Sequence, residues 1–318
     1  MIGRSEVEAA WARIRPHVRR TPVIELAAGT LGVAAPVALK LEALQPGGSF
    51  KARGAFHKLL ASKVPAAGIV AASGGNHGVA AAYAARALGH KAEIFVPTTS
   101  SPTKVARLRS YGAVVNLVGA VYAEARAASE MRAAETRALI VPAYEDEVVF
   151  AGAGSVALDF AEQAAFDTLL VAVGGGGLIA GCAAAMGDKV KIVAVETEGT
   201  PTLYEARRAG KPVDVAISGI AADALGASRI GTPNFCLAQK WVRDAVLVTD
   251  DSVRAAQRAL WDELRIVAEP SGATGLAALM SGTYKPAAGE RMATLICRAG
   301  STNARRARPV VSRRYEYS

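Results

Sequence analysis

The 318-residue sequence contains few cysteines and histidines, and neither type forms a recognisable metal or catalytic pattern. Its three cysteines, Cys182, Cys236 and Cys297, are widely spaced and odd in number. Such a set offers no zinc-binding spacing and fits a reducing compartment better than a disulfide framework. The four histidines form no H-E-x-x-H motif, and no G-x-S-x-G motif is present. These absences disfavour metalloproteases and serine hydrolases.

Long apolar segments are also missing. No run of about 18 apolar residues occurs, so we expect no transmembrane helix. The first six residues, MIGRSE, lack the apolar core of a signal peptide. The composition, 51% hydrophobic and 20% charged, is that of a globular protein. We therefore expect a cytoplasmic protein with no membrane partner.

Positive charge is in excess, with a formal net charge of +9. No recognisable nucleic-acid-binding module accompanies it, so we expect a solvated surface and no nucleic-acid partner. The arginines gather near both ends of the chain: Arg13, Arg15, Arg19, Arg20, Arg305, Arg306, Arg308, Arg313 and Arg314.

Short β-branched runs alternate with alanine-rich stretches, a pattern typical of parallel βαβ units. One such unit is expected at residues 68–141. Its strands are predicted at 68–72, 92–96 and 113–118, and its first helix at 76–88. A second helix is predicted to begin at Pro102, with Ser101 as N-cap and Gly112 after its end.

A second βαβ series is predicted on both sides of this unit. It has strands at 36–42, 169–173, 191–195 and 292–297 and helices at 178–186 and 251–265. The simplest architecture is α/β, with two open, twisted, parallel-type sheets flanked by helices. We expect a large domain of residues 1–67 plus 142–318, a smaller inserted domain of residues 68–141, and a cleft between them.

Three loops contain residues that could take part in binding or catalysis. The first is at residues 45–55 and carries Lys51. Ser49 is a plausible N-cap, which would place Lys51 in the first turn of a helix. The helix dipole and the neighbouring Arg53 would then disfavour the ammonium form of Lys51 and leave a nucleophilic amine.

The second loop, residues 73–78, reads SGGNHG and again links a predicted strand to a helix N-terminus. Such a turn can present backbone N–H groups and small polar side chains to a phosphate or a carboxylate. A purely structural glycine turn is an equally good interpretation of this loop alone.

The third loop, residues 173–178, contains four successive glycines before a predicted helix, a conformation that can wrap closely around a phosphate. Gly175, Gly177 and Ala180 also fit the G-x-G-x-x-A pattern, and Glu196 ends the next strand. This nearly matches the dinucleotide-binding fingerprint, so the loop alone would also fit a nicotinamide-dependent oxidoreductase.

Taken together, four segments resemble one known family. They are KLEALQPGGSFKARGA (40–55), SGGNHG (73–78), GGGGL (174–178) and EPSGA (269–273). Their order and spacing resemble the fold-type II enzymes that use pyridoxal 5′-phosphate, within the threonine/serine dehydratase and serine racemase group. This resemblance implies a tryptophan synthase β-like architecture.

The resemblance also implies the cofactor site. Lys51 would carry the cofactor as a Schiff base, Phe50 would pack on its ring, and Asn76 would bind the ring hydroxyl. The partner of the ring nitrogen is left open between Cys297, which we favour, and Ser301. The whole implied set is Phe50, Lys51, Asn76, Gly174, Gly175, Gly176, Gly177, Leu178, Gly219, Cys297 and Ser301.

For the substrate, the resemblance implies contacts from Ser73, Gly74, Asn76 and His77. Racemase-like members have a serine as second base where this chain has Gly74, and racemisation needs two bases. This departure favours a dehydratase. The divalent-cation site of some members uses a glutamate and an aspartate, here Glu196 and Thr202. A hydroxyl is the poorer ligand for a hard cation, so no metal is predicted.

The implied function is β-elimination of water from L-threonine or L-serine, giving a 2-oxo acid and ammonia. The alternatives, in order, are a dehydratase for 3-phenylserine or 3-hydroxyaspartate, a serine racemase-like enzyme and a nicotinamide-dependent oxidoreductase. A homodimer is expected from the resemblance.

Overall fold

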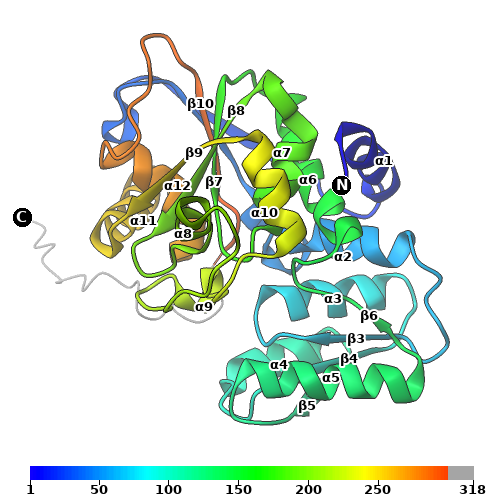
Figure 1. The fold of residues 1–318 in the computed structure, drawn as a ribbon. Coiled ribbons are helices and arrows are strands. Elements are labelled where there is room, and N and C mark those ends of the chain that lie inside the picture. Colours follow the sequence, from blue (N-terminus) through cyan, green and yellow to red (C-terminus); the bar gives the residue numbers. More distant parts are fainter. Residues whose placement is uncertain (300–318) are drawn as a thin grey trace, which may run out of the picture.

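The computed structural model describes residues 1–299, which form two sheets flanked by helices (Figure 1). The larger sheet has six strands in the order β1-β2-β10-β7-β8-β9. All neighbours in it run parallel except the edge pair β1–β2. The strands are β1 (Val23–Leu26), β2 (Val37–Lys40), β7 (Thr168–Ala172), β8 (Lys191–Thr197), β9 (Val242–Val248) and β10 (Met292–Leu295).

Both faces of the inner strands β2, β7, β8 and β10 are buried, which explains why these strands are largely apolar. Successive side chains of a strand point to opposite faces. Accordingly, Leu169 and Val171 of β7 join one hydrophobic cluster, whereas Leu170 between them joins another. The first cluster involves α1 (Arg4–Ile14), α2 (Lys51–Leu60), α6 (Glu147–Ala161), α7 (Gly177–Met186) and α10 (Thr232–Trp241). The second involves α11 (Asp250–Leu264) and α12 (Pro270–Met280).

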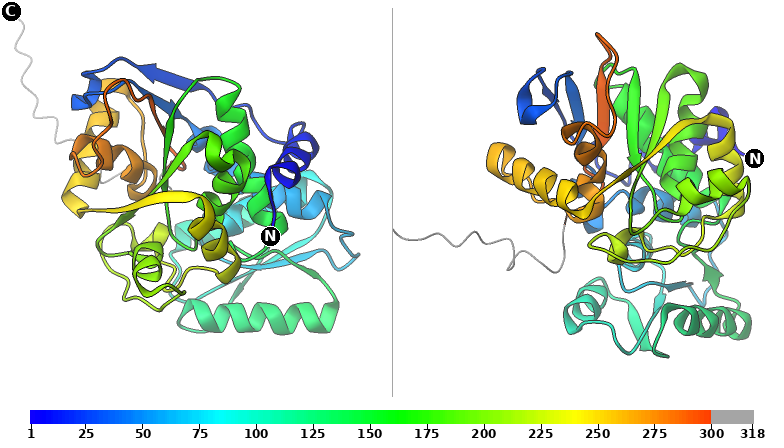
Figure 2. Two further views of the ribbon diagram at one scale, coloured as in Figure 1. Left: turned by 45° about the horizontal axis from the view of Figure 1, so that its top comes forward. Right: turned by 60° about the vertical axis from the view of Figure 1, so that its left-hand side comes forward.

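The smaller sheet is parallel throughout and has the order β5-β4-β3-β6. Its strands are β3 (Ile69–Ala72), β4 (Ala92–Val96), β5 (Val114–Leu117) and β6 (Leu139–Ile140). Helices α3 (Asn76–Ala87) and α4 (Pro102–Ser110) cover one face, and α5 (Tyr122–Thr136) covers the other. Figure 2 shows this part of the chain, in cyan to green, beside the larger sheet in both views.

Short helices complete the described chain. Two α-helices, α8 (Thr202–Ala209) and α9 (Ala222–Leu225), lie between β8 and β9. The 3-10 helices are η1 (Thr30–Gly32), η2 (Glu42–Leu44), η3 (Pro46–Gly48) and η4 (Gly187–Lys189). Within residues 1–299, no helix has both the length and the apolar character needed to span a bilayer.

The predicted α/β class with two parallel-type sheets is confirmed, and several element boundaries agree closely. The strand predicted at 92–96 is β4, with the same bounds. Ser101 caps α4 by accepting a hydrogen bond from the Lys104 backbone N–H at 3.4 Å, and Pro102 begins the helix. Gly112 follows that helix with a left-handed φ of +80°, which glycine adopts without a steric cost.

The predicted N-cap of α2 is wrong. The N-cap is Phe50, and Ser49 lies before it in extended conformation, paired with Arg298 in an isolated β-bridge. The segment that follows β10 therefore determines the backbone at Ser49, and this tertiary pairing overrides the capping preference of serine. Lys51 is nonetheless the first residue of α2, as predicted.

A buried cluster of charges holds the first turn of α2 against the larger sheet. The Arg53 guanidinium donates to both carboxylate oxygens of Glu42, at 2.7 and 2.8 Å, and also to Asp159. Lys40, at the end of β2, pairs with Asp159 at 2.9 Å. All four side chains are inaccessible to solvent. Because an unpaired charge is very costly to bury, these four groups fix one another's positions.

Candidate active site

Four segments that each follow a parallel strand converge on one cavity. These are the segments after β2, β3, β7 and β10, which contain Lys51, Asn76, the glycine loop and Cys297. In open parallel sheets, binding sites form beyond the carboxyl ends of the strands. We call this space the lysine cavity; its lining is Phe50, Lys51, Asn76, Tyr144, Ala172, Gly174, Gly175, Gly176, Gly177, Leu178, Ala224, Leu225, Ser271, Cys297 and Arg298.

Lys51 directs its amine across the lysine cavity. Its Nζ donates to the backbone oxygen of Ala143 at 2.7 Å and lies 5.3 Å from the centre of the Phe50 ring. Burial, and to a lesser extent the positive charge of Arg298, lower the pKa of Lys51 to about 8. The predicted lowering agrees with this value, but Arg53 is not the charge that causes it. Arg53 is held in the buried cluster, and Arg298 supplies the neighbouring charge.

The glycine loop after β7 forms a close-fitting wall of the lysine cavity. The backbone oxygen of Gly174 accepts from Thr202 Oγ1 at 2.8 Å, and that of Gly175 accepts from Asn234 Nδ2 at 2.7 Å. A Cβ atom on Gly175 would lie 2.5 Å from the Cδ atoms of the Tyr144 ring, so no larger residue fits there. Helix α7 begins directly after this loop, and its first N–H groups are available to a phosphate.

The lysine cavity also offers neutral polar groups. The Cys297 thiol lies 3.3 Å from the backbone oxygen of Ser271, and burial raises its pKa to about 12, so it stays protonated. Ser271 Oγ is buried and has no hydrogen-bond partner among residues 1–299. Ser301, the alternative to Cys297, lies outside the described residues.

Arg298 introduces a positive charge into the lysine cavity. Its guanidinium forms an ion pair with Glu269, and the side chain is 9% exposed. The Asn76 carboxamide lies against it and, with its oxygen facing the guanidinium, accepts from Nη1 at 2.8 Å. Asn76, Arg298 and Lys51 therefore surround one small polar space.

These groups fit pyridoxal phosphate. The glycine loop and the start of α7 form a cradle for a phosphate, and Lys51 supplies an amine for an aldehyde. The unpartnered Ser271 Oγ and the Cys297 thiol are neutral hydrogen-bonding groups in the lining of the same cavity.

Of the four residues expected to contact the substrate, only Asn76 lines the lysine cavity. Ser73 Oγ accepts from the Gly75 backbone N–H at 3.1 Å, and Ser100 Oγ lies 3.3 Å from where a Cβ atom of Gly74 would be. His77 Nε2 lies 2.8 Å from the Val141 backbone oxygen. Burial and the charge of Lys51 lower the pKa of His77 to about 4, so its ring is neutral.

Gly219 also lies outside the lining of the lysine cavity. A Cβ atom there would meet the Asp250 carboxylate at 2.9 Å, and the same carboxylate accepts from the Ile220 backbone N–H. Ala224 and Leu225, from the same connection, line the cavity in its place.

Glu196 is fully engaged with the start of α8. Its carboxylate accepts from Thr202 Oγ1 at 2.9 Å and from the backbone N–H groups of Leu203 and Tyr204 at 2.8 and 2.7 Å. These bonds leave it poorly placed to hold the ribose that a dinucleotide-binding loop requires. In the part of the chain that the structure describes, no three His, Cys, Asp or Glu side chains gather as a metal site would require.

Sequence reasoning gave no role to three side chains that line the lysine cavity: Tyr144, Ser271 and Arg298. Ser271 belongs to the EPSGA segment that carried the resemblance, so its motif could have identified it. Arg298 directly follows the predicted residue Cys297, but no predicted motif includes it. Tyr144 follows the two-residue strand β6, and no motif surrounds it.

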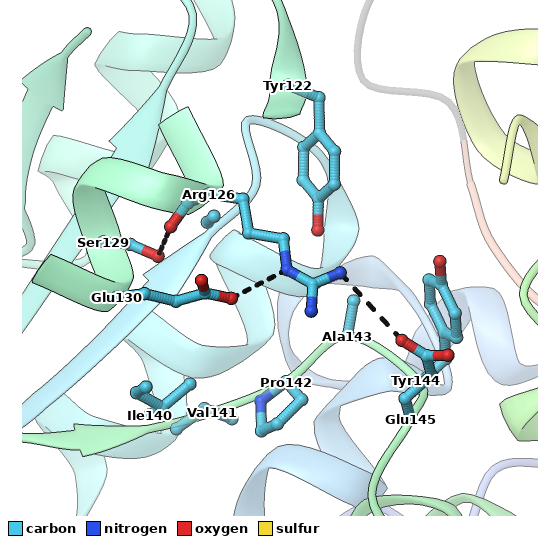
Figure 3. A pocket seen from close by; sticks show the side chains of 11 residues that line it. Tyr122, Arg126, Ser129, Glu130, Ile140, Val141, Pro142, Ala143, Tyr144 and Glu145 are labelled. Atoms are coloured by element: carbon cyan, nitrogen blue, oxygen red, sulfur yellow. Dashed lines mark hydrogen bonds and ion pairs between the residues drawn. The ribbon is translucent and has the colours of Figure 1, made fainter. Parts of the chain in front are cut away.

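A second cavity of about 240 Å³ adjoins the first (Figure 3). It lies between α5 and the segment after β6, and Tyr144 lines both cavities. We call it the tyrosine cavity; its lining is Ala72, Tyr122, Arg126, Ser129, Glu130, Ile140, Val141, Pro142, Ala143, Tyr144 and Glu145.

Residues 14–298 match the sequence profile of the family described as pyridoxal-phosphate dependent enzyme. The chain is 37% identical over 265 residues to the biosynthetic L-threonine dehydratase of Pasteurella multocida, covering 81% of this chain and 52% of that protein. It therefore spans about half the length of that relative. It is 36% identical over 299 residues to phenylserine dehydratase of Ralstonia pickettii, covering 92% of this chain and 91% of that protein.

The fold agrees with a solved relative. The structure of maize serine racemase superimposes with a TM-score of 0.88 and 29% sequence identity, covering 94% of this chain and 93% of that one. The two sheets and the convergence of their loops are thus shared with a protein of similar length.

Proposed function

Because the chain belongs to the pyridoxal-phosphate-dependent enzyme family, we propose that it removes water from a small β-hydroxy amino acid, L-threonine or L-serine. The products would be a 2-oxo acid and ammonia. One observation carries the proposal: an amine with a pKa of about 8, that of Lys51, shares a cavity with a glycine loop at the start of α7.

Lys51 has two roles in this proposal. Its Nζ would hold the cofactor and would accept the proton from Cα of the substrate. With a pKa of about 8, roughly a tenth of the amine is neutral at pH 7, far more than at the ordinary value of 10.5. When bound, pyridoxal phosphate supplies an electron sink for the charge that develops at Cα.

The remaining groups bind and orient. The first N–H groups of α7 and the glycine loop would hold the phosphate, and Asn76 and Cys297 would contact the ring. A protonated thiol cannot stabilise a positive charge as a carboxylate does, so the Cys297 thiol would favour a neutral ring nitrogen. Gly74 offers no side chain that could act as a second base, which supports elimination over racemisation.

A second candidate is dehydration of a bulkier substrate such as 3-phenylserine. It is favoured by the similarity to a phenylserine dehydratase over nearly the full length of both proteins. The tyrosine cavity next to Lys51 would provide room for a larger side chain.

The test is release of 2-oxo acid from L-threonine, L-serine, threo-3-hydroxyaspartate and 3-phenylserine. Replacing Lys51 with alanine should lower turnover by at least 10²- to 10⁴-fold, the usual contribution of a general base. Lys51→Arg, which keeps the positive charge but provides no neutral amine, is the matched control and should be equally inactive. Turnover that survives either change would refute the role of Lys51.

We further propose the two-domain division at residues 68 and 141, which the grouping of β3 to β6 in one sheet supports. A homodimer is proposed from family resemblance, to be tested by light scattering.

We also propose a cytoplasmic protein that does not bind nucleic acid. The N-terminal arginines support this, since Arg19 donates to the Leu44 backbone oxygen and Arg15 and Arg20 face Glu162 and Asp159.

A further inference from the structure

The tyrosine cavity is separated from Lys51 by a single stretch of backbone. Ala143, whose backbone oxygen accepts from Lys51 Nζ at 2.7 Å, is also part of the tyrosine cavity lining. The next residue, Tyr144, lines both cavities. The tyrosine cavity therefore lies beside the place that a substrate with its Cα at Lys51 would occupy.

Two tyrosines form walls of this cavity. Tyr122 stands at the first position of α5, and Figure 3 shows its ring directed toward the segment that carries Ala143 and Tyr144. The Tyr144 ring rests on Gly175, and its backbone oxygen accepts from Asn234 Nδ2 at 3.0 Å, which fixes its position. Burial raises the pKa of Tyr144 to about 12, so its hydroxyl is neutral and can donate. Ile140, Val141 and Pro142 add apolar surface to the lining.

The charges of the cavity do not favour an anion. Arg126 is the one cation in the lining, and its Nε pairs with Glu130 at 2.9 Å. Its Nη1 faces Glu145 at 3.9 Å (Figure 3). One cation thus stands between two carboxylates, and a third carboxylate from a ligand would add repulsion. An uncharged aromatic ring of a ligand, by contrast, can pack against both tyrosine rings and can place its face against the Arg126 guanidinium.

We propose that the tyrosine cavity is the subsite for the substrate side chain and that it favours an uncharged aromatic ring over a carboxylate or a methyl group. The inference rests on the part of the proposed function that places the substrate Cα at Lys51. Among the candidate substrates it favours the second, a β-aryl-β-hydroxy amino acid, over L-threonine and L-serine, and it assigns Tyr122 to specificity.

The kinetic test compares kcat/KM for threo-3-phenylserine with kcat/KM for L-threonine. Tyr122→Ala should lower this ratio about three- to tenfold, the usual worth of one aromatic contact. Tyr122→Phe keeps the ring and should keep the ratio. Val121→Ala is the matched control, since Val121 is the exposed neighbour of Tyr122 and is not part of either lining. An unchanged ratio, or an equal loss on both substrates, would overturn the inference.

A binding test decides the question without turnover. L-Phenylalanine, L-aspartate and L-alanine lack a β-hydroxyl group and cannot lose water. L-Phenylalanine should raise the Tm of the cofactor-loaded protein more than the other two, and Tyr122→Ala should remove that difference. If the panel yields no 2-oxo acid, the proposed function fails, yet this measurement still supports or rejects the subsite. Equal stabilisation by all three amino acids would reject it.

Discussion

The two adjoining cavities are built in opposite ways. The lysine cavity is lined by backbone and by buried side chains, with Cys297, Asn76 and Arg298 exposed by only 3%, 6% and 7%. The tyrosine cavity has charged side chains at its mouth, such as Arg126, which is 51% exposed. In the first, each group is held by neighbours that leave no space for another residue. In the second, side chains can change without disturbing the fold. Chemistry is therefore expected to depend on the first and selectivity on the second.

The largest effect on cofactor binding is expected at Gly175. In Gly175→Ala the new Cβ would lie 2.5 Å from carbons of the Tyr144 ring, so the loop or the ring must move. Overpacking of this kind costs about 1–3 kcal/mol, and we expect pyridoxal phosphate to bind about tenfold more weakly or worse. Titration of the cofactor followed by absorbance measures this. Gly75→Ala is the control, because its Cβ would meet only Ser73 Oγ, at 3.8 Å. Equal affinity in the two variants would show that the lysine cavity is not tightly packed.

An intermediate effect is expected from Arg298→Met. The positive charge of Arg298 lowers the pKa of Lys51, because it disfavours a second positive charge nearby. Its removal should raise that pKa above about 8, and Glu269, left without the guanidinium, would raise it further. The amine then becomes neutral only at higher pH. The acid limb of the pH profile for cofactor binding should move upward by up to about one unit.

Arg126→Met is the matched control for this measurement, since Arg126 belongs only to the tyrosine cavity. It should leave the acid limb in place. A shift to lower pH in Arg298→Met, or equal shifts in both variants, would contradict the electrostatic account of Lys51.

The smallest effect is expected from Arg126→Ala on the free energy of unfolding. The exposed Arg126–Glu130 pair is separated by one helical turn and contributes about 1 kcal/mol or less. The contrasting variant is Arg53→Met, which leaves Glu42 and Asp159 buried without their main partner and should cost about 3–5 kcal/mol. Urea denaturation measures both. Similar losses would mean that the two regions do not differ as their burial indicates.

Several helix boundaries could be predicted from sequence because local chemistry determines them. Ser101, Pro102 and Gly112 bound α4 through interactions within a few residues, and the structure has them as predicted. Runs of glycine at 174–177 are similarly informative, because other residues cannot adopt or fit that backbone.

Contacts between distant segments account for what the sequence did not reveal. Arg53 is two residues from Lys51 in sequence, yet its guanidinium is bound to Glu42 and Asp159. Arg298 is far away in sequence and supplies the charge that acts on Lys51. Ser49 has good capping chemistry but is paired with the segment after β10. The tyrosine cavity likewise forms between α5 and residues 140–145, and no local sequence pattern predicts that these two segments lie together.

The buried charge cluster at Arg53 also affects the conformational entropy of the backbone that carries Lys51. Lys51 and Arg53 share the first turn of α2, and Arg53 is fixed to Glu42 and Asp159 when the chain folds. The backbone that carries the reactive amine is therefore immobilised before any ligand arrives. The conformational freedom lost in placing that amine belongs to folding and does not recur in each catalytic cycle. Preorganisation of the lysine is thus a property of the assembled core.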